Sequence, residues 1–266
     1  MGDLHGDLGH ALQAFQTFAQ NDVRVILQLG DWGVLWPGQN WQTDLNKMSR
    51  ALSRHHQTFY FVDGNHDWHP KLQEFPVDLD GLRWISGNVA HLPRGYRSVI
   101  GGRFTLAALG GGNSTDRDLR EEGKTWWPEE QIADADLERL GNDRVDVLVG
   151  HEAPLMDEAD QDRRSTELGI PPKEAAYAAH SRFMFRRAVL QTRPRLTLGG
   201  HYHRFVDETL TLPGAPPTRV VVLDMNGPQR VNMAILHTQT LELDFLHRNG
   251  DRTYSTNTAP ERTNND

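Results

Sequence analysis

Short apolar segments of this 266-residue chain repeatedly end near a glycine that is followed at once by an aspartate, an asparagine or a histidine. A glycine separates Val23–Leu29 from Asp31, and another lies between Thr58–Val62 and Asn65. Such segments are typical of buried strands, and the stretches between them carry the apolar spacing of helices. Alternating strands and helices predict an α/β fold. In an open α/β sheet the loops after the carboxyl ends of the strands form the ligand crevice, so we expect these polar residues to meet there.

The order of the predicted elements favours a single domain over residues 1–247. Apolar spacing predicts helices at Asp7–Gln20, Asn40–His56, Pro128–Leu140 and Lys173–Thr192. Strands are predicted at Val23–Leu29, Thr58–Val62, Arg97–Ile100, Arg103–Leu109, Val145–Val149, Leu196–Leu198, Val220–Leu223, Val231–Leu236 and Leu241–Leu246. The polar segment 248–266 contains almost no apolar residues and is predicted to be a disordered tail.

The composition argues against several classes of protein. The chain has 28 basic and 36 acidic side chains and a formal net charge of −8, which argues against general nucleic-acid binding because phosphate backbones are bound mainly by Lys and Arg. It has no cysteine, so any metal ion must be held by His, Asp, Glu or Asn. No apolar run approaches the roughly 20 residues that cross a bilayer. The N-terminus lacks the regions of a signal peptide, so we expect a cytoplasmic protein with no membrane partner.

Five glycine-led loops bring oxygen and imidazole ligands to one edge of the predicted sheet. These side chains suit borderline divalent metals in the absence of sulfur: Asp3, His5, Asp31, Asn65, His151, His201 and His203. The set is too large for one tetrahedral zinc, which takes about four ligands. It suits two ions that share one carboxylate, and Asp31 is the natural bridge. Paired ions about 3.5–4 Å apart clamp the attacking and leaving oxygens in phosphoester hydrolases.

Each of these loops also has an ordinary structural interpretation. A single Gly-Asp or Gly-His pair is common turn chemistry, and Asn65 tolerates the left-handed backbone of a turn. His201 and His203 alternate, so a strand would place both on one face, where they could simply lie at the surface. The presence of five such loops in one chain favours a functional site over coincidence.

Five blocks of the chain resemble the motifs of calcineurin-like metallophosphoesterases: Gly2-Asp3-Leu4-His5-Gly6, Gly30-Asp31, Gly64-Asn65-His66-Asp67, Gly150-His151 and Gly200-His201-Tyr202-His203. The resemblance extends from Gly2 to about His203. It implies a four-layer α/β fold, with a central β-sandwich flanked by helices and two metal ions at the sheet edge. One ion is implied at Asp3, His5, Asp31 and His203, and the other at Asp31, Asn65, His151 and His201. The stretch Asn113–Trp127 is similar to a subgroup of phage and actinobacterial members.

The resemblance implies a hydrolase that cleaves phosphoester bonds by a metal-bridging hydroxide. It places His66 near the leaving oxygen, and an imidazole with an ordinary pKa of about 6.5 can protonate a departing alkoxide. Manganese is the expected metal, with iron, zinc, nickel or cobalt as alternatives. Asn113 and Arg117 are predicted to bind the substrate, with Arg120 as a second candidate cation. Asp67 is predicted either to orient an imidazole or to bond within its own turn.

Differences between this chain and one subgroup of the family narrow the range of expected substrates. Members that act on phosphoproteins carry a second Asp and then Arg shortly after the position of Asp31, where this chain has Val34 and Leu35. They also carry Glu at the position of Asp67. We therefore expect phosphodiesters or small nucleotides, since an acidic protein repels long nucleic acids. A phosphomonoesterase or protein phosphatase, and a catalytically inactive scaffold of the same fold, stay as alternatives. The sequence leaves the oligomeric state open.

The segment before the first block is short for this family. Members carry an apolar strand immediately before the Asp-x-His block, and here Met1 and Gly2 alone precede Asp3. The first strand is therefore predicted to be truncated. Neighbouring backbone groups left unpaired would each cost on the order of 1–3 kcal/mol. We expect the chain to be less stable than a version lengthened upstream.

Overall fold

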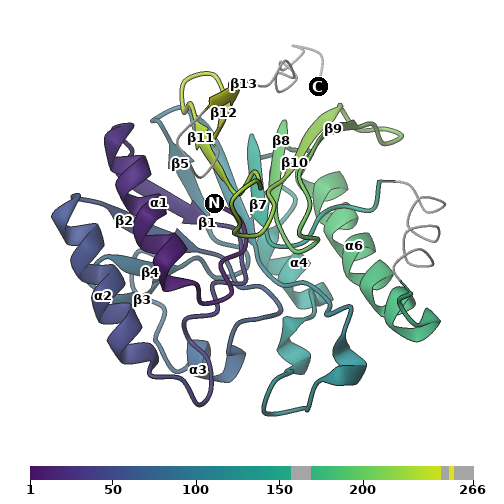
Figure 1. Ribbon diagram of the computed structural model, residues 1–266. Coiled ribbons are helices and arrows are strands. Elements are labelled where there is room, and N and C mark those ends of the chain that lie inside the picture. The colour runs from purple at the N-terminus through teal and green to yellow at the C-terminus, as the bar shows by residue number, and fades with distance from the viewer. Residues whose placement is uncertain (157–168, 247–251, 255–266) are drawn as a thin grey trace.

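Two β-sheets pack face to face between two layers of helices in the computed structural model, which describes residues 1–156, 169–246 and 252–254 (Figure 1). The helices α1 (Leu8–Gln20) and α2 (Trp41–Arg54) cover the outer side of the first sheet. The helices α4 (Asp134–Leu140) and α6 (Pro172–Thr192) cover the second. These layers confirm the predicted α/β fold with a central β-sandwich flanked by helices.

The first sheet has four strands in the order β1-β2-β4-β3. Its strands are β1 (Val25–Gln28), β2 (Thr58–Phe61), β3 (Arg83–Ser86) and β4 (Val89–His91), and the short helix α3 (His69–Gln73) precedes β3. Because β1, β2 and β4 run parallel, their carboxyl ends lie at one edge. The helices bury apolar side chains against the outer face of this sheet, among them Phe15, Phe18, Met48 and Leu52.

The second sheet has six strands in the order β5-β6-β7-β8-β10-β9. Its strands are β5 (Arg97–Ile100), β6 (Phe104–Leu109), β7 (Val147–Gly150), β8 (Leu196–Gly199), β9 (Val206–Leu210) and β10 (Thr218–Val222). The four central strands β6, β7, β8 and β10 run parallel, so this sheet also delivers several loops to one edge. No helix in the described ranges has both the length and the apolar character that a membrane crossing requires.

The strand β7 shows why the strands could be recognised in the sequence. Val147 and Val149 belong to the core between the two sheets, whereas Leu148 packs with the helices on the outer side. Successive side chains of a strand point to opposite faces, and here both faces are buried. Strands of this kind are continuous apolar runs, which stand out against their polar loops.

The predicted helix Pro128–Leu140 is interrupted. The structure has a short 3-10 turn, η2 (Pro128–Glu130), followed by α4 (Asp134–Leu140). The Oδ2 atom of Asp136 accepts a hydrogen bond from the N–H of Ala133 at 2.8 Å and so starts a new helix there. The elements β3, β4, β9 and α3 were not predicted, because their apolar patterns are too short to stand out.

The third sheet consists of β11 (Met233–Leu236), β12 (Leu243–Leu246) and β13 (Arg252–Tyr254), which pair antiparallel. The strand β13 lies within the segment 248–266, which the sequence predicts to be a disordered tail. It forms because the edge of β12 offers backbone hydrogen-bond partners, which composition does not reveal. The rest of the predicted tail lies outside the described residues.

Residues Met1–Leu4 run beside β1 without forming a regular strand. The Met1 ammonium group donates to the carbonyl oxygen of Leu27 at 2.6 Å, and the N–H of Leu29 donates to the carbonyl oxygen of Met1 at 2.9 Å. The first residue is thus bonded to the open edge of β1. From this contact the chain continues directly into the loop that contains Asp3 and His5.

Candidate metal centre

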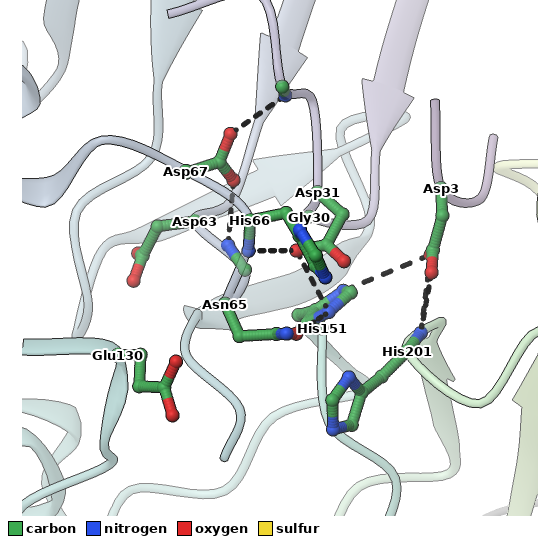
Figure 2. Close-up of polar contacts among 12 residues, drawn as sticks. Asp3, Gly30, Asp31, Asp63, Asn65, His66, Asp67, Glu130, His151 and His201 are labelled. Carbon is green, nitrogen blue, oxygen red and sulfur yellow. Dashed lines mark hydrogen bonds and ion pairs between the residues drawn. The ribbon is translucent and has the colours of Figure 1, made fainter. Parts of the chain in front are cut away.

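Side chains from five loops meet at the edge of the sheets where the parallel strands end (Figure 2). These loops precede α1 and follow β1, β2, β7 and β8. The structure brings together all the residues that the sequence predicts as metal ligands: Asp3, His5, Asp31, Asn65, His151, His201 and His203. This convergence brings His5 and His203, which are 198 positions apart, into contact.

The first group of ligands consists of Asp3, His5, Asp31 and His203, each offering one atom within 4.8 Å of the others. Nε2 of His203 lies 3.3 Å from Oδ2 of Asp3, and Nε2 of His5 lies 3.8 Å from Oδ2 of Asp31. Both aspartates are buried, whereas His5 is half-buried and His203 is exposed. The group therefore opens to solvent on its histidine side.

The second group consists of the buried residues Asp31, His151 and His201, with Asn65 beside them. Nε2 of His151 lies 3.3 Å from Oδ1 of Asp31 and 3.0 Å from Oδ1 of Asn65. Asp31 therefore turns Oδ2 toward the first group and Oδ1 toward the second. A carboxylate in this position can bridge two metal ions.

Two backbone carbonyls decide which imidazole nitrogen of the second group carries a proton. Nδ1 of His151 lies 2.8 Å from the carbonyl oxygen of Leu29, and Nε2 of His201 lies 3.1 Å from that of Asn113. A carbonyl oxygen only accepts, so these nitrogens donate, and the opposite nitrogen of each neutral ring keeps its lone pair. Metal-ligating histidines are oriented by hydrogen bonds of this kind.

The donor atoms of the second group fit a divalent metal ion. With a neutral ring, Nε2 of His151, Oδ1 of Asn65 and Oδ1 of Asp31 are all acceptors, and a positive charge between them satisfies all three. A proton can supply that charge, since burial lowers the pKa of His151 but Asp31 and Asp3 outweigh this effect and raise the pKa to about 10. A divalent cation can supply this positive charge in place of the proton, because such ions accept imidazole, carboxylate and amide ligands.

The backbone at the site adopts a conformation that costs energy. Four ligand residues have positive φ angles: His5 (46°), Asp31 (55°), His201 (73°) and His203 (49°). Residues with a Cβ avoid this region, at a cost of roughly 1–2 kcal/mol each. Strain of this kind gathers at functional sites. The angles also correct one interpretation: β8 ends at Gly199, so His201 and His203 lie in a left-handed turn and not on one face of a strand.

Two of the glycines before the ligands are required by crowding between loops. A Cβ at Gly30 would lie 2.5 Å from the ring of His151. A Cβ at Gly64 would overlap the Asp31 carboxylate and lie 2.9 Å from Cδ2 of His151. The repeated glycine therefore leaves space in which side chains of neighbouring loops converge.

Two buried aspartates near Asn65 hold these loops in place. Asp67 accepts hydrogen bonds from the N–H groups of Gly33 at 3.0 Å and Gly64 at 2.8 Å, and so joins the loops after β1 and β2. This is the turn-bonding role, one of the two that the sequence predicts for Asp67. Asp63 forms an ion pair with Arg94 at 2.6 Å and thereby anchors the end of β2.

His66 lies beside the first group, with its ring centroid 4.8 Å from that of His5. Trp36 stacks on His66 with 6.1 Å between ring centroids and 29° between planes. Arg120 contacts both ring nitrogens of His66, and its Nη1 donates to the carbonyl oxygen of Asn65 at 3.2 Å. Burial lowers the pKa of His66 to about 4, with Asp31 opposing this effect and Arg120 adding to it. The ring is therefore neutral at pH 7 in this arrangement.

The two residues predicted to bind substrate have other partners. Arg117 lies 3.1 Å from Glu174, and its guanidinium lies 4.0 Å from the ring centre of Tyr177. Asn113 is fully buried, and its Nδ2 donates to the carbonyl oxygen of Tyr177 at 2.7 Å. Substrate binding by Asn113 and Arg117 stays a prediction, whereas Arg120 is the arginine that contacts His66.

Sequence reasoning did not single out Trp36, and it placed Arg117 before Arg120 as the candidate substrate-binding arginine. The turn η1 (Arg117–Leu119) directs these two arginines to different partners, which no spacing pattern reveals. Trp36 lies between a predicted strand and a predicted helix, so no apolar spacing pattern singles it out as a site residue. Trp127 is buried and meets Trp36 edge-on, with 5.4 Å between the ring centroids.

Residues 1–205 match the pattern of the calcineurin-like phosphoesterases, and this range contains both ligand groups. The chain belongs to the calcineurin-like phosphoesterase family. Membership confirms the resemblance inferred from the five sequence blocks. It implies metal-dependent hydrolysis of phosphoesters at a dinuclear divalent metal centre, and the two groups that share Asp31 are the candidate for that centre.

Solved structures resemble this calcineurin-like phosphoesterase in fold. The protein TT1561 of Thermus thermophilus aligns with a TM-score of 0.54 and 14% identity, over 93% of this chain and 97% of its own. GAP50, the anchor in the inner membrane complex of Plasmodium, aligns with a TM-score of 0.52 and 10% identity, over 99% of this chain and 89% of its own. At such identities the likeness concerns the fold alone. A comparison with curated protein sequences finds no match.

Proposed function

We propose that this calcineurin-like phosphoesterase hydrolyses phosphodiesters or small nucleotides, and that His66 is its general acid. The observation that carries the proposal is the pair of ligand groups that share Asp31 and lie beside His66 and Arg120. Divalent ions bound there would activate water and neutralise phosphoryl oxygens. Manganese is the metal that we would supply first, with iron, zinc, nickel and cobalt as alternatives.

Arg120 is well placed to bind a phosphoryl oxygen. Its side chain is 6% exposed and pairs with Asp116 at 2.8 Å, which holds the guanidinium against His66. Arginine binds phosphate through strong charge-assisted hydrogen bonds. An anionic substrate beside His66 would favour the protonated imidazole, because an opposite charge stabilises it. His66 could then donate this proton to the leaving oxygen.

Trp36 favours a substrate with an aromatic group. The side chain is half-buried, and Trp127 supports it from the edge while His66 faces its ring plane. A nucleobase stacks well on an aromatic side chain of this kind. The net charge of −8 favours a compact substrate over a long nucleic acid. These features support a small nucleotide as the partner of the site.

A comparison of leaving groups tests the proposal. With Mn²⁺ added, we expect faster hydrolysis of bis-p-nitrophenyl phosphate than of p-nitrophenyl phosphate. In His66→Ala, hydrolysis of a dinucleotide should fall by about 10²–10⁴-fold, because its alkoxide must be protonated as it leaves. Nitrophenolate departs without a proton, so the rate on bis-p-nitrophenyl phosphate should fall much less.

Other results would redirect this proposal. Equal losses on both diesters would contradict the general-acid role of His66. Faster hydrolysis of the monoester would favour the phosphomonoesterase or protein phosphatase alternative. If folded, metal-loaded protein turned over none of these substrates, the inactive scaffold would be the better interpretation.

Arg120 and Arg117 provide a matched pair for the phosphate contact. We expect Arg120→Met to lower kcat/KM on bis-p-nitrophenyl phosphate by about 10- to 100-fold, mainly through KM, since a hydrogen bond to a charged group contributes about 1.5–3 kcal/mol. Arg117→Met should change kcat/KM by less than about threefold, because the Arg117 guanidinium contacts Glu174 and Tyr177, whereas Arg120 is the arginine that contacts His66. Steady-state kinetics on both variants measure the difference. A larger loss in Arg117→Met than in Arg120→Met would favour Arg117, the arginine predicted from the sequence, as the one that binds the substrate.

A further inference from the structure

Asn65 can serve the second ligand group only through its oxygen. The two ends of a side-chain amide have nearly the same shape, but Oδ1 accepts whereas Nδ2 donates. Oδ1 faces Nε2 of His151 at 3.0 Å. Which end faces the metal position is therefore decided by the hydrogen bonds of the other end of the amide.

The Nδ2 end of the Asn65 amide begins a chain of hydrogen bonds in which each group donates toward Glu130. Nδ2 of Asn65 donates to Oγ of Ser114 at 3.2 Å, and Oγ of Ser114 donates to Oε2 of Glu130 at 2.5 Å. The N–H of Ser114 and the hydroxyl of Tyr177 both donate to Oε1 of Glu130, at 2.8 Å and 3.0 Å. The Glu130 carboxylate accepts all of these bonds, and each donor is thereby oriented.

The chain of bonds is enclosed in the protein. Asn65 is 3%, Ser114 0% and Glu130 1% exposed. Glu130 belongs to η2, whereas Ser114 lies in the loop after β6, so two segments are held together here. In Figure 2 the side chain of Asn65 lies between Asp31 and Glu130. Water is largely excluded from this position, so a donor that lost its partner would find no replacement.

We propose that Glu130 is a positioning residue, which acts through Ser114 to keep the amide oxygen of Asn65 directed at the second metal position. This inference rests on the proposed function, because it requires a metal ion in that group. Glu130 itself contacts neither Asp31 nor the histidines of the site in the bonds described above. Its role is to set the polarity of the hydrogen bonds that reach Asn65.

A glutamine at position 130 would reverse that polarity with little change of shape. Its Oε1 would take the bonds from the Ser114 N–H and the Tyr177 hydroxyl, which places its NH₂ group against Oγ of Ser114. That hydroxyl would then accept from the glutamine and donate its own proton toward Asn65. The Asn65 amide would have to turn, and its NH₂ group would face the metal position.

Metal binding by the whole chain tests this inference with Mn²⁺ as the probe. Equilibrium dialysis of the wild type should show two ions per chain. In Glu130→Gln the ion at the second group should bind about 10- to 100-fold more weakly, the usual effect of a lost outer partner. The ion at the first group should keep its affinity. At a Mn²⁺ concentration that fills the second group of the wild type but not that of Glu130→Gln, the wild type should give the electron paramagnetic resonance spectrum of a coupled Mn²⁺ pair. The variant should give that of isolated Mn²⁺.

Glu174→Gln is the matched control. Glu174 is also buried, at 2% exposure, but its carboxylate pairs with Arg117 and not with Ser114. This variant should keep two ions with wild-type affinities. Ser114→Ala provides a second route if Glu130→Gln does not fold, because it removes the link to Asn65 and leaves the carboxylate in place. It should weaken the same single ion by about tenfold.

The possible outcomes separate the inference from the proposed function. If the folded wild type binds no Mn²⁺, the proposed function fails, and the inference fails with it. If the wild type binds two ions and Glu130→Gln binds two with unchanged affinities, the inference alone is overturned. Equal weakening of both ions in Glu130→Gln would also overturn it, because a turned Asn65 amide affects the second group alone.

Discussion

Asp31→Asn is expected to abolish turnover and to lower the metal content of the protein below two ions per chain. Asp31 is the residue that both ligand groups share, and it is 1% exposed. Asparagine keeps the shape and can still accept the bond from the N–H of His66, which Oδ1 of Asp31 receives at 2.6 Å. It loses the negative charge that would hold two cations together. The fold should therefore survive while the metal centre does not.

The size of this effect follows from what paired metal ions contribute to phosphoester hydrolysis. They provide several kcal/mol of charge stabilisation in the transition state, and about 4 kcal/mol corresponds to roughly a thousandfold in rate. We expect kcat/KM on bis-p-nitrophenyl phosphate to fall by at least that factor, with Mn²⁺ content measured on the same samples.

Asp146→Asn provides the control for loss of a buried carboxylate. Asp146 is 3% exposed, and its Oδ2 accepts a hydrogen bond from the N–H of Thr105 at 2.9 Å. It lies at the amino end of β7, away from the site. It should keep two Mn²⁺ ions per chain. If Asp31→Asn retained two ions and near wild-type turnover, Asp31 would not be the bridging ligand.

Gly64→Ala is expected to disrupt the site by steric overlap alone. The backbone of Gly64 is not in the left-handed region, but a Cβ there would overlap the Asp31 carboxylate and its backbone N, and would lie 2.9 Å from Cδ2 of His151. These atoms belong to the shared ligand and to a neighbouring ligand, so Asp31 would have to move. We expect loss of at least one Mn²⁺ ion and a fall of kcat/KM by about 100-fold or more, because displacement of a reacting group by about 1 Å can cost that factor.

The same substitution should also lower stability. Adding a methyl group to a packed interior costs about 1–3 kcal/mol, so the thermal unfolding midpoint should fall by several degrees. Gly87→Ala is the matched control, since a Cβ at Gly87 has no atom within 4 Å and its φ is not positive. Calorimetry and metal analysis on both variants measure the two effects. Wild-type metal content in Gly64→Ala would show that the loop after β2 adapts without moving Asp31.

Much of the architecture was visible in the sequence because its signals are local. Helices such as α1 and α2 carry apolar residues at helical spacing, and strands such as β7 are apolar on both faces. The ligands follow glycines at the ends of these strands, so their residue types and their grouping at one edge could be predicted. The helix predicted at Pro128–Leu140 was interrupted because the Asp136 side chain caps a new helix, and composition does not indicate such a bond.

The sequence by itself determined most of the helices and strands, the α/β class and the identity of the seven candidate ligands, because each depends on residues close together in the chain. The tertiary structure decided which arginine reaches His66, that Trp36 stacks on it, and that Glu130 sets the hydrogen bonds of Asn65. Asn65 and Ser114 are 49 positions apart, and His66 and Arg120 are 54 apart. Contacts over such separations arise when parallel strands deliver distant loops to one edge, and no local pattern records which side chains will then face each other.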